Sequence, residues 1–446
     1  MGEDKTTPRK QALYTPKDDD FDLRSQKYKG QQYSHLYYCR LHKLRGILTS
    51  LAQQQYPNAG VRNILSLVEG EECIVIGTLY KQMQLRPSIL DEYAKERSVF
   101  PLVSPHNFVH ADDYLILEDE SGRIRLVGET ISARAYVTGV VAAVYGREGS
   151  NGEFLVQHIL EPGLPPQEPL PSQKIPVVAV EDKYVALVSG LRICANEANP
   201  LQFQLLVDYL TGHLGDEKEH SAVAQVVHVV IAGDSVHLQY NLLTGQSISS
   251  KDQSKLVEPV KELDLALTQL AAAVPVDVMP GANDPANFSL PQQALHTCLF
   301  PGASVYNTFY AATNPHCFEL DGVRFLGTSG QNIDDLDKYS DASDRVEFME
   351  RTLRWRHIAP TAPDTLGCYP YTDKDPFILD SCPHVYFCGN QEKYMTRLVK
   401  GEQGHLVRLV SVPHFYDTGI AVLVNLKNLD CHVLCLSTDL LRSNGV

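Results

Sequence analysis

Apolar residues recur at helical spacing near the start of the chain. Leucines and tyrosines return every three or four positions from Tyr33 to Leu51, and Asn58-Ala59-Gly60 then supplies a stop signal. This spacing predicts one helix with a single buried face. Residues 1–30 carry Pro, Lys and the cluster Asp18-Asp19-Asp20 with almost no apolar period, which predicts a disordered tail.

From residue 72 to residue 158 the pattern changes to short apolar and β-branched runs separated by turn residues. The runs are Cys73–Tyr80, Tyr114–Glu118, Arg123–Val127, Val137–Tyr145 and Phe154–His158, with a longer insertion at 81–111. Five strands with this spacing predict a small barrel that resembles the oligonucleotide/oligosaccharide-binding (OB) type. Together with the helix they predict a first domain over residues 31–160.

Prolines crowd the next segment and indicate a domain boundary. The sequence predicts a Pro-rich linker over 161–180 and a second domain over 181–440, because proline stiffens the chain and removes donors. In that second domain strand-like runs alternate with helical periods, an order typical of α/β layers. The expected strands are 184–191, 225–231, 274–279, 318–326, 385–388, 405–412, 420–426 and 431–436, and the expected helices are 200–213, 255–273, 333–339 and 343–356. Because the chain ends in three strands, we expect a mixed or doubled sheet.

Charge and composition narrow the possible functions. The 446 residues contain 39 Lys and Arg against 54 Asp and Glu, a formal net charge of −15. Non-specific binding to nucleic acid relies on Lys and Arg that neutralise phosphates, so this charge argues against the chain holding DNA by itself. The longest apolar stretches, such as Ala186–Leu191, fall far short of the roughly 20 residues that span a bilayer, and we expect no membrane crossing. The ten cysteines contain no C-x-x-C pair, which is typical of a reducing compartment.

Candidate chemistry lies where several predicted strands end in small or polar residues. These ends are Ser189-Gly190, Gly233-Asp234, Gly281-Ala282-Asn283-Asp284 and Gly389-Asn390. Ligands of α/β sheets bind at the carboxyl ends of strands, so the four loops predict the framework of a site. The arrangement is similar to the calcineurin-like metallophosphoesterases, and this resemblance implies loops that supply Asp, Asn and His ligands to two metal ions.

Most of the implied ligands are replaced in this chain. Ser189 and Leu191 stand where the resemblance implies Asp and His, and leucine cannot coordinate a metal. The remaining vestigial candidates for a metal site are Asp234, His237, Asp284 and Glu392. Because bridging and terminal ligands are both missing, we expect a degenerate site with no catalytic residue, no bound metal and no cofactor.

Longer strings resemble the B-subunit family of eukaryotic replicative DNA polymerases, and within it the delta branch. They are TAPDTLGCYP at 361–370 and CPHVYFCGN at 382–390, with further agreement at 205–208, 276–281 and 322–332. The family-signature residues within them are Asp364, Pro370, Gly389 and Asn390. The similarity runs from about Tyr33 to the C-terminal strands. One departure is Asp234, where the delta branch often has an amide residue.

The resemblance implies an OB-type five-stranded barrel joined to a catalytically inactive, calcineurin-like α/β sandwich that acts as a scaffold. It implies two direct partners, the C-terminal domain of the catalytic subunit of DNA polymerase delta and a third subunit of that polymerase. Contact with the sliding clamp and primer-template DNA is then indirect, and the expected location is the nucleus, in DNA replication and repair synthesis. Two alternatives stay open, an active metal-dependent phosphodiesterase and a single-stranded DNA-binding OB protein.

Overall fold

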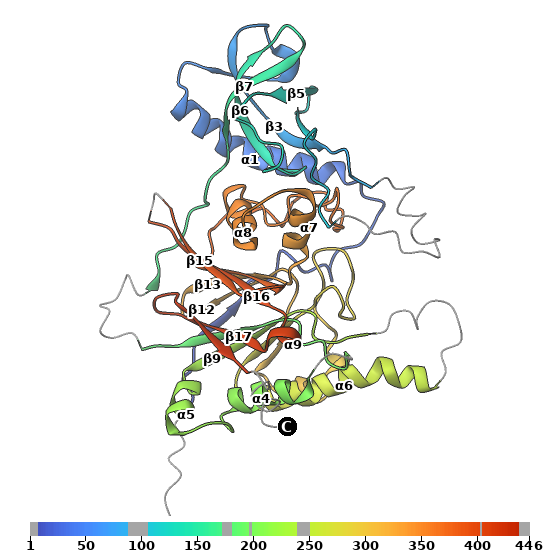
Figure 1. The fold of residues 1–446 in the computed structure, drawn as a ribbon, viewed down its shortest axis with the longest axis vertical. Helices are drawn as coiled ribbons and strands as arrows, with labels where there is room; N and C mark the ends of the chain where they lie inside the picture. Colours follow the sequence, from blue (N-terminus) through green and yellow to red (C-terminus); the bar gives the residue numbers. More distant parts are fainter. Residues whose placement is uncertain are drawn as a thin grey trace, which may run out of the picture. The chain divides into compact units, whose positions relative to one another are not determined.

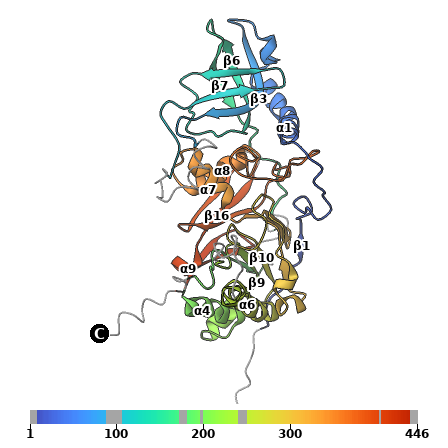
Figure 2. The ribbon, with the colours of Figure 1, turned by 90° about the vertical axis from the view of Figure 1, so that its right-hand side faces the viewer.

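The computed structural model describes residues 8–87, 106–171, 181–195, 199–238, 250–401 and 404–436. The chain forms two compact units, each assembled from separate stretches of sequence. The first unit contains residues 1–27, 167–331 and 383–446, and the second contains residues 28–166 and 332–382. Figures 1 and 2 show the ribbon from two directions. The division of the chain near residue 166 falls in the predicted Pro-rich linker, of which residues 172–180 lie outside the described part.

The second unit contains a barrel and the long helix α1 (Ser34–Gln55). The sheet order is β2-β3-β4-β5-β7-β6, and an additional β3–β6 pairing closes it. The strands are β2 (Gly60–Arg62), β3 (Glu72–Gln82), β4 (Tyr114–Glu118), β5 (Arg123–Val127), β6 (Val141–Glu148) and β7 (Glu153–Leu160). The five predicted strands correspond to β3–β7. Leu41, Leu44 and Leu48 of α1 pack against Ile74 and Val141 of the barrel, as the helical period predicts.

The first unit contains two six-stranded sheets. One has the order β11-β10-β9-β8-β17-β18 and the other β1-β12-β13-β14-β16-β15. The strands of the first sheet are β8 (Tyr184–Val188), β9 (Val226–Ala232), β10 (Val276–Met279), β11 (Phe309–Ala311), β17 (Ile420–Asn425) and β18 (Cys431–Cys435). Those of the second are β1 (Tyr14–Pro16), β12 (His316–Leu320), β13 (Val323–Thr328), β14 (Val385–Gln391), β15 (Met395–Lys400) and β16 (Leu406–Pro413). Both sheets mix parallel and antiparallel pairs, in agreement with the expected mixed or doubled sheet.

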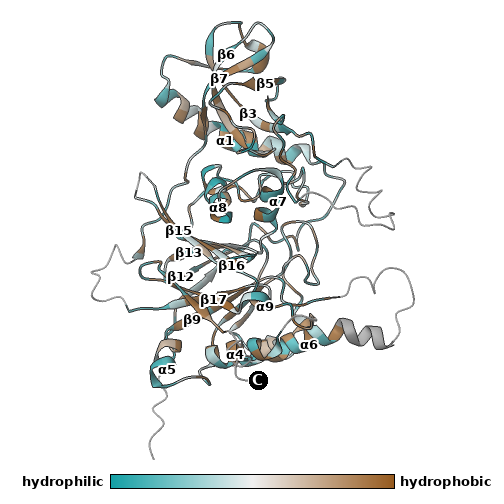
Figure 3. Ribbon diagram, viewed as in Figure 1, coloured by the Kyte–Doolittle hydropathy of each residue, from teal (hydrophilic) through white to brown (hydrophobic). Residues whose placement is uncertain are grey.

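The two sheets are held together by an apolar layer between them. Val185, Leu187 and Val230 of one sheet meet Phe318 and Val410 of the other. All seven residues of β9 are buried, as expected for a parallel strand covered on both faces, and Figure 3 shows its apolar colour. The opposite face of the first sheet is covered by the helices α4 (Pro200–Thr211) and α6 (Ser250–Ala273), as both ribbon views show.

Local signals explain where these helices begin and end. Asn199 caps α4 by accepting a hydrogen bond from Leu201 N, Pro200 follows at the first helical position, and Gly212 closes the helix at φ 82°. Asp216 and Glu219 form a capping box at the start of α5 (Glu217–Val223). Among the described residues, the remaining helical segments are α7 (Gln331–Tyr339), α8 (Arg345–Arg354), α9 (Phe415–Thr418) and three short turns at Ile64–Ser66, Thr297–Leu299 and Ala303–Val305.

The structure differs from the sequence prediction in three ways. The predicted disordered tail is wrong for residues 14–16, because β1 pairs antiparallel with β12. The predicted strand 318–326 is two strands, since Asp321 and Gly322 have positive φ and form a turn. The predicted second domain over 181–440 is divided, because residues 332–382 belong to the barrel unit. A strand of only three residues is too short to show a periodic pattern in the sequence, and no local pattern shows that residues 332–382 pack with the barrel unit.

Candidate functional site

Loops from both sheets of the first unit meet at the carboxyl ends of the parallel strands. Ser189, directly after β8, donates from Oγ to the carbonyl oxygen of Pro413 at 3.1 Å. Asn390 donates from Nδ2 to the carbonyl oxygens of Ala232 at 3.1 Å and Ser329 at 2.8 Å, and its backbone N donates to Ser189 Oγ at 2.8 Å. The four sequence-predicted loops therefore lie in one place, and buried side-chain hydrogen bonds hold them there.

The geometry of this place explains two of the family-signature residues. A Cβ atom on Gly389 would lie 2.5 Å from the carbonyl oxygen of Ala232, so only glycine fits. Asn390 has φ 57°, in the left-handed region that Asn tolerates better than most residues. Asp364 lies in the second unit, where its Oδ2 accepts a hydrogen bond from Arg86 Nη1 at 2.9 Å. Pro370 also belongs to that unit.

Asp234 is buried and its carboxylate is already engaged. Its Oδ1 accepts a hydrogen bond from the backbone N of Asn283 at 3.0 Å, and its Oδ2 accepts one from Asn283 Nδ2 at 2.7 Å. Arg192 Nη2 lies 3.9 Å from Oδ2 and supplies a further positive charge. The residue therefore joins the loop after β9 to the loop after β10.

Asp284 makes the reciprocal connection between the same two loops. Its Oδ1 accepts from the backbone N of Ser235 at 2.9 Å and of Val236 at 3.1 Å, and its Oδ2 accepts from Gly281 N at 2.8 Å. Burial, followed by repulsion from Asp234, raises the pKa of Asp284 to about 7. Two neighbouring carboxylates whose oxygens accept internal hydrogen bonds are less able to bind a metal ion than free ones, because binding would break those bonds.

The other vestigial candidates do not join this pair. His237 and Glu392 are exposed at the surface. Leu191, at the position where the resemblance implies a histidine, is buried in the apolar core with α4 and α6. Within the described ranges, no group of three or more His, Cys, Asp and Glu side chains is arranged to hold a metal ion.

A second buried polar cluster lies between the two sheets, and no pattern in the sequence predicted it. His316 Nδ1 lies 2.8 Å from Asp18 Oδ2, and His316 Nε2 lies 3.0 Å from Asp277 Oδ2. Tyr14 donates from Oη to Asp277 Oδ2 at 2.9 Å, and its ring stacks on His228. The available signal was the presence of His228 and Asp277 inside otherwise apolar strands, since a buried polar residue requires a partner.

Charge complementarity sets the protonation of this cluster. Burial opposes the charge of His316, but the carboxylates of Asp18 and Asp277 outweigh burial and raise the pKa of His316 to about 9. Burial also opposes the charge of Asp277, yet His228 and His316 hold its pKa well below the usual range. The N-terminal segment that contains Tyr14 and Asp18 is therefore fixed to the sandwich by a charged contact.

The described part of the barrel unit presents stacked aromatic rings and several arginines that are paired with carboxylates. Tyr56, Tyr145 and His158 stack on one another, with ring centroids 4.2 Å apart for the two tyrosines. Ion pairs on the described barrel surface include Arg45–Glu120, Arg62–Glu71, Arg123–Glu118 and Arg125–Glu153. Each of these arginines lies within 4 Å of a carboxylate, which weakens its attraction for a phosphate.

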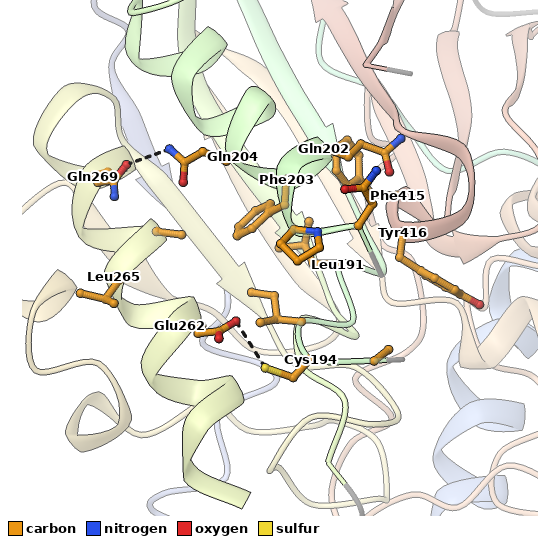
Figure 4. Close-up of a pocket in the computed structure, with 15 residues that line it drawn as sticks. Leu191, Cys194, Gln202, Phe203, Gln204, Glu262, Leu265, Gln269, Phe415 and Tyr416 are labelled. Atoms are coloured by element: carbon orange, nitrogen blue, oxygen red, sulfur yellow. Dashed lines mark hydrogen bonds between the residues drawn. The ribbon is translucent and has the colours of Figure 1, made fainter. Parts of the chain in front are cut away.

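The first unit contains a cavity of about 380 Å³ between α4 and α6. Figure 4 shows Phe203 within it, the Cys194–Glu262 hydrogen bond at one end and the Gln204–Gln269 contact at the other. Its lining is mostly apolar and contains none of the four residues predicted for the metal site. In the described part of the chain, no helix combines the length and the apolar character that crossing a membrane requires.

Two family models match the chain. The model described as DNA polymerase delta subunit OB-fold domain matches residues 32–159, which contain α1 and the barrel. The model that describes the B-subunit of DNA polymerases alpha and epsilon matches residues 185–397, which contain the strand-end loops. The expected OB-type barrel is thereby confirmed.

Curated relatives match almost the whole length. The DNA polymerase delta small subunit of Oryza sativa subsp. japonica is 61% identical over 97% of this chain and 99% of its own length. The small subunit of Arabidopsis thaliana is 59% identical over 99% of both chains. DNA polymerase delta subunit 2 of Drosophila melanogaster is 38% identical over 97% of this chain and 99% of its own. This chain therefore belongs to the family of DNA polymerase delta small subunits.

Proposed function

We propose that this chain is a non-catalytic accessory subunit of DNA polymerase delta, with a role in DNA replication and repair synthesis in the nucleus. It bridges the C-terminal domain of the catalytic subunit and a third subunit that associates with the sliding clamp. The observation that carries the proposal is the near-complete coverage by delta small subunits from plants and an insect. The sandwich of the first unit is, in this proposal, an inactivated phosphoesterase-like domain.

The state of the remnant carboxylates supports the scaffold role. Asp234 and Asp284 accept hydrogen bonds from the neighbouring loops, so their present effect is to fix those loops. Leu191 supplies an apolar side chain to the core instead of a metal ligand. A site of this kind contributes shape and stability, while reaction chemistry resides in the polymerase subunit that the scaffold holds.

The bridging role is tested by reconstitution. The catalytic subunit and the third subunit are co-expressed with and without this full-length chain, and the third subunit is captured through a tag. We expect recovery of the catalytic subunit in near-equal amount only when this chain is present. Equal recovery in its absence would show that the other two subunits bind directly, and would exclude the bridge.

The proximity of Asp234 and Asp284 favours a second candidate function, a metal-dependent phosphodiesterase. The assay measures nitrophenol release from bis-p-nitrophenyl phosphate with Mn²⁺, with Asp234→Ala as the matched control. The scaffold proposal expects the same background rate for both proteins. A rate that depends on Mn²⁺ and is lost in Asp234→Ala would establish the phosphodiesterase instead.

A further inference from the structure

The cavity between α4 and α6 is a groove with an apolar floor. Leu191, Ile193, Phe203, Ala266 and Phe415 contribute to its lining. Its polar lining includes the amides Asn199, Gln202, Gln204 and Gln269, which need no counter-ion. A concave apolar surface with a few polar groups is the usual form of a binding site in proteins.

Apolar side chains extend this surface beyond the groove itself. Leu265 lines the groove and is 66% exposed. Leu201 on α4 follows the lining residue Pro200 and is 51% exposed, and Val257 on α6 precedes the lining residue Glu262 by five positions and is 47% exposed. Val257 and Leu265 are eight residues apart on α6, a spacing at which two residues share one broad face of a helix. Exposed apolar side chains on an apolar groove and next to it in sequence are typical of a surface that a partner covers. Because Leu201 and Val257 lie outside the cavity, a small ligand inside the cavity would leave them uncovered.

The charged residues on and beside the groove indicate which kind of polypeptide segment would bind in it. Among the described residues that line the groove, Glu262 is the one with a formal charge, and its carboxylate accepts a hydrogen bond from Cys194 Sγ at 3.3 Å. Glu258, one turn earlier on α6, is exposed as well. Lys261 lies on α6 between them but does not line the groove. An apolar groove with an acidic edge complements apolar side chains flanked by Lys or Arg.

We propose that this groove is the docking site for a polypeptide segment of another polymerase subunit, one that presents apolar anchor residues next to basic residues. The inference rests on the function proposed above and adds a surface to it. The anchors fill the space beside Phe203 and Leu265, and the basic residues lie over Glu262 and Glu258. Apolar anchors in a desolvated groove supply most of the binding energy of such contacts, and the charges set orientation.

The first test changes the surface while leaving the core intact. The double variant Leu201→Glu/Leu265→Glu is assembled with the catalytic and third subunits, and its affinity for the complex is compared with the wild type. We expect at least tenfold weaker association with an unchanged thermal transition of the free protein. Phe288→Glu is the matched control, because Phe288 belongs to the same unit, is 84% exposed and does not line the groove. Wild-type affinity of the double variant would overturn the proposal.

The second test measures coverage of the groove directly. Leu265→Cys is alkylated with N-ethylmaleimide in the free protein and in the assembled complex, and labelling is followed by peptide mass spectrometry with exposed Cys298 as the internal reference. We expect labelling at position 265 to slow at least tenfold in the complex, with Cys298 unchanged. An unchanged rate inside an intact complex would overturn the docking site and leave the bridging function standing. Failure of the wild type to assemble would refute the bridging function itself.

The alkylation test also distinguishes a segment of another subunit from a second copy of this chain as the occupant of the groove. A second copy of this chain would protect position 265 in the free protein in proportion to protein concentration, and that result would overturn the proposal. The charge argument has its own readout. Glu262→Lys is expected to weaken assembly more than Glu262→Gln, and the difference is expected to shrink at high salt, where charges are screened.

Discussion

Arg40 shows how much a single buried residue can organise. Its side chain is fully buried in the second unit, and its guanidinium donates to Asp375 Oδ2 at 2.8 Å and to the carbonyl oxygens of Pro360 and Ala362 at 2.8 and 2.7 Å. Burial, followed by the charge of Arg40, lowers the pKa of His357 to about 4, so the His357 ring beside Asp375 is neutral at physiological pH. One arginine of α1 thereby connects the helix to the segment 332–382.

Arg40→Met is expected to destabilise the protein by about 3–5 kcal/mol, because it leaves the Asp375 carboxylate buried without its charged partner. The measurement is urea unfolding of the full-length protein followed by circular dichroism. Arg45→Ala is the control, since the Arg45–Glu120 pair is partly exposed and such pairs contribute at most about 1 kcal/mol. Equal losses for the two variants would contradict this account of Arg40.

At the scale of elements, the N-terminal segment is a structural part of the sandwich. Arg9 donates to the carbonyl oxygens of Val226 at 2.7 Å and Val223 at 3.1 Å, β1 pairs with β12, and Asp18 reaches His316. A window of sequence predicts disorder here because the segment has few apolar residues and many charges. Arg9 and Asp18 find their partners 217 and 298 positions away, and no local pattern reveals such contacts.

The Asp18–His316 contact predicts a pH dependence. The pKa of His316 is raised from its ordinary value of 6.5 to about 9. Its contribution to the unfolding free energy is therefore fully present below pH 6.5 and is lost as the pH rises through 9. The groups that face it are Asp18, Asp277 and Tyr310. We expect the unfolding free energy of the wild type to fall by roughly 1–3 kcal/mol between pH 6.5 and pH 9. In Asp18→Asn this fall is expected to be smaller, and an identical pH profile would show that the contact does not hold the segment.

The surface of the barrel leads us to expect little or no binding to single-stranded DNA. Its aromatic stack of Tyr56, Tyr145 and His158 offers a platform for bases, but Tyr145 Oη donates to Glu72. Arg62 and Arg125 are each paired with a carboxylate. A fluorescence titration of the isolated subunit with a labelled oligonucleotide is expected to be flat near physiological salt. Saturable, salt-sensitive binding that is lost in Tyr145→Ala would support the DNA-binding alternative.

At the scale of the whole molecule, the chain crosses between its two units more than once. The barrel unit includes residues 332–382, which interrupt the sequence of the sandwich. This segment supplies Asp375 to Arg40 and Ile378 to the core around α1. The organisation follows from where the buried partners lie, and it contradicts the simple order of one domain after another.

A fragment that ends at the Pro-rich segment is therefore expected to contain a barrel of reduced stability. The fragment 28–166 is expected to unfold at least ~3 kcal/mol more easily than the same fragment linked to residues 332–382, because it leaves Arg40 without Asp375. Urea unfolding of both fragments measures the difference. If the short fragment were equally stable, residues 332–382 would be dispensable for the barrel unit.

The sequence by itself determined the helix 34–55, the five main strands of the barrel, most strands of the sandwich and the family, because these depend on local periodicity and on long matching strings. It also located the four strand-end loops, and it predicts that most of the metal ligands implied there by the resemblance are replaced. Only the tertiary structure decided that Asp234 and Asp284 are engaged with neighbouring loops, that Asp18 pairs with His316, and that Arg40 holds residues 332–382. These contacts join residues that are 49 to 335 positions apart in the sequence. Their energies depend on burial and on the distance between charges, and both are set only when the chain folds.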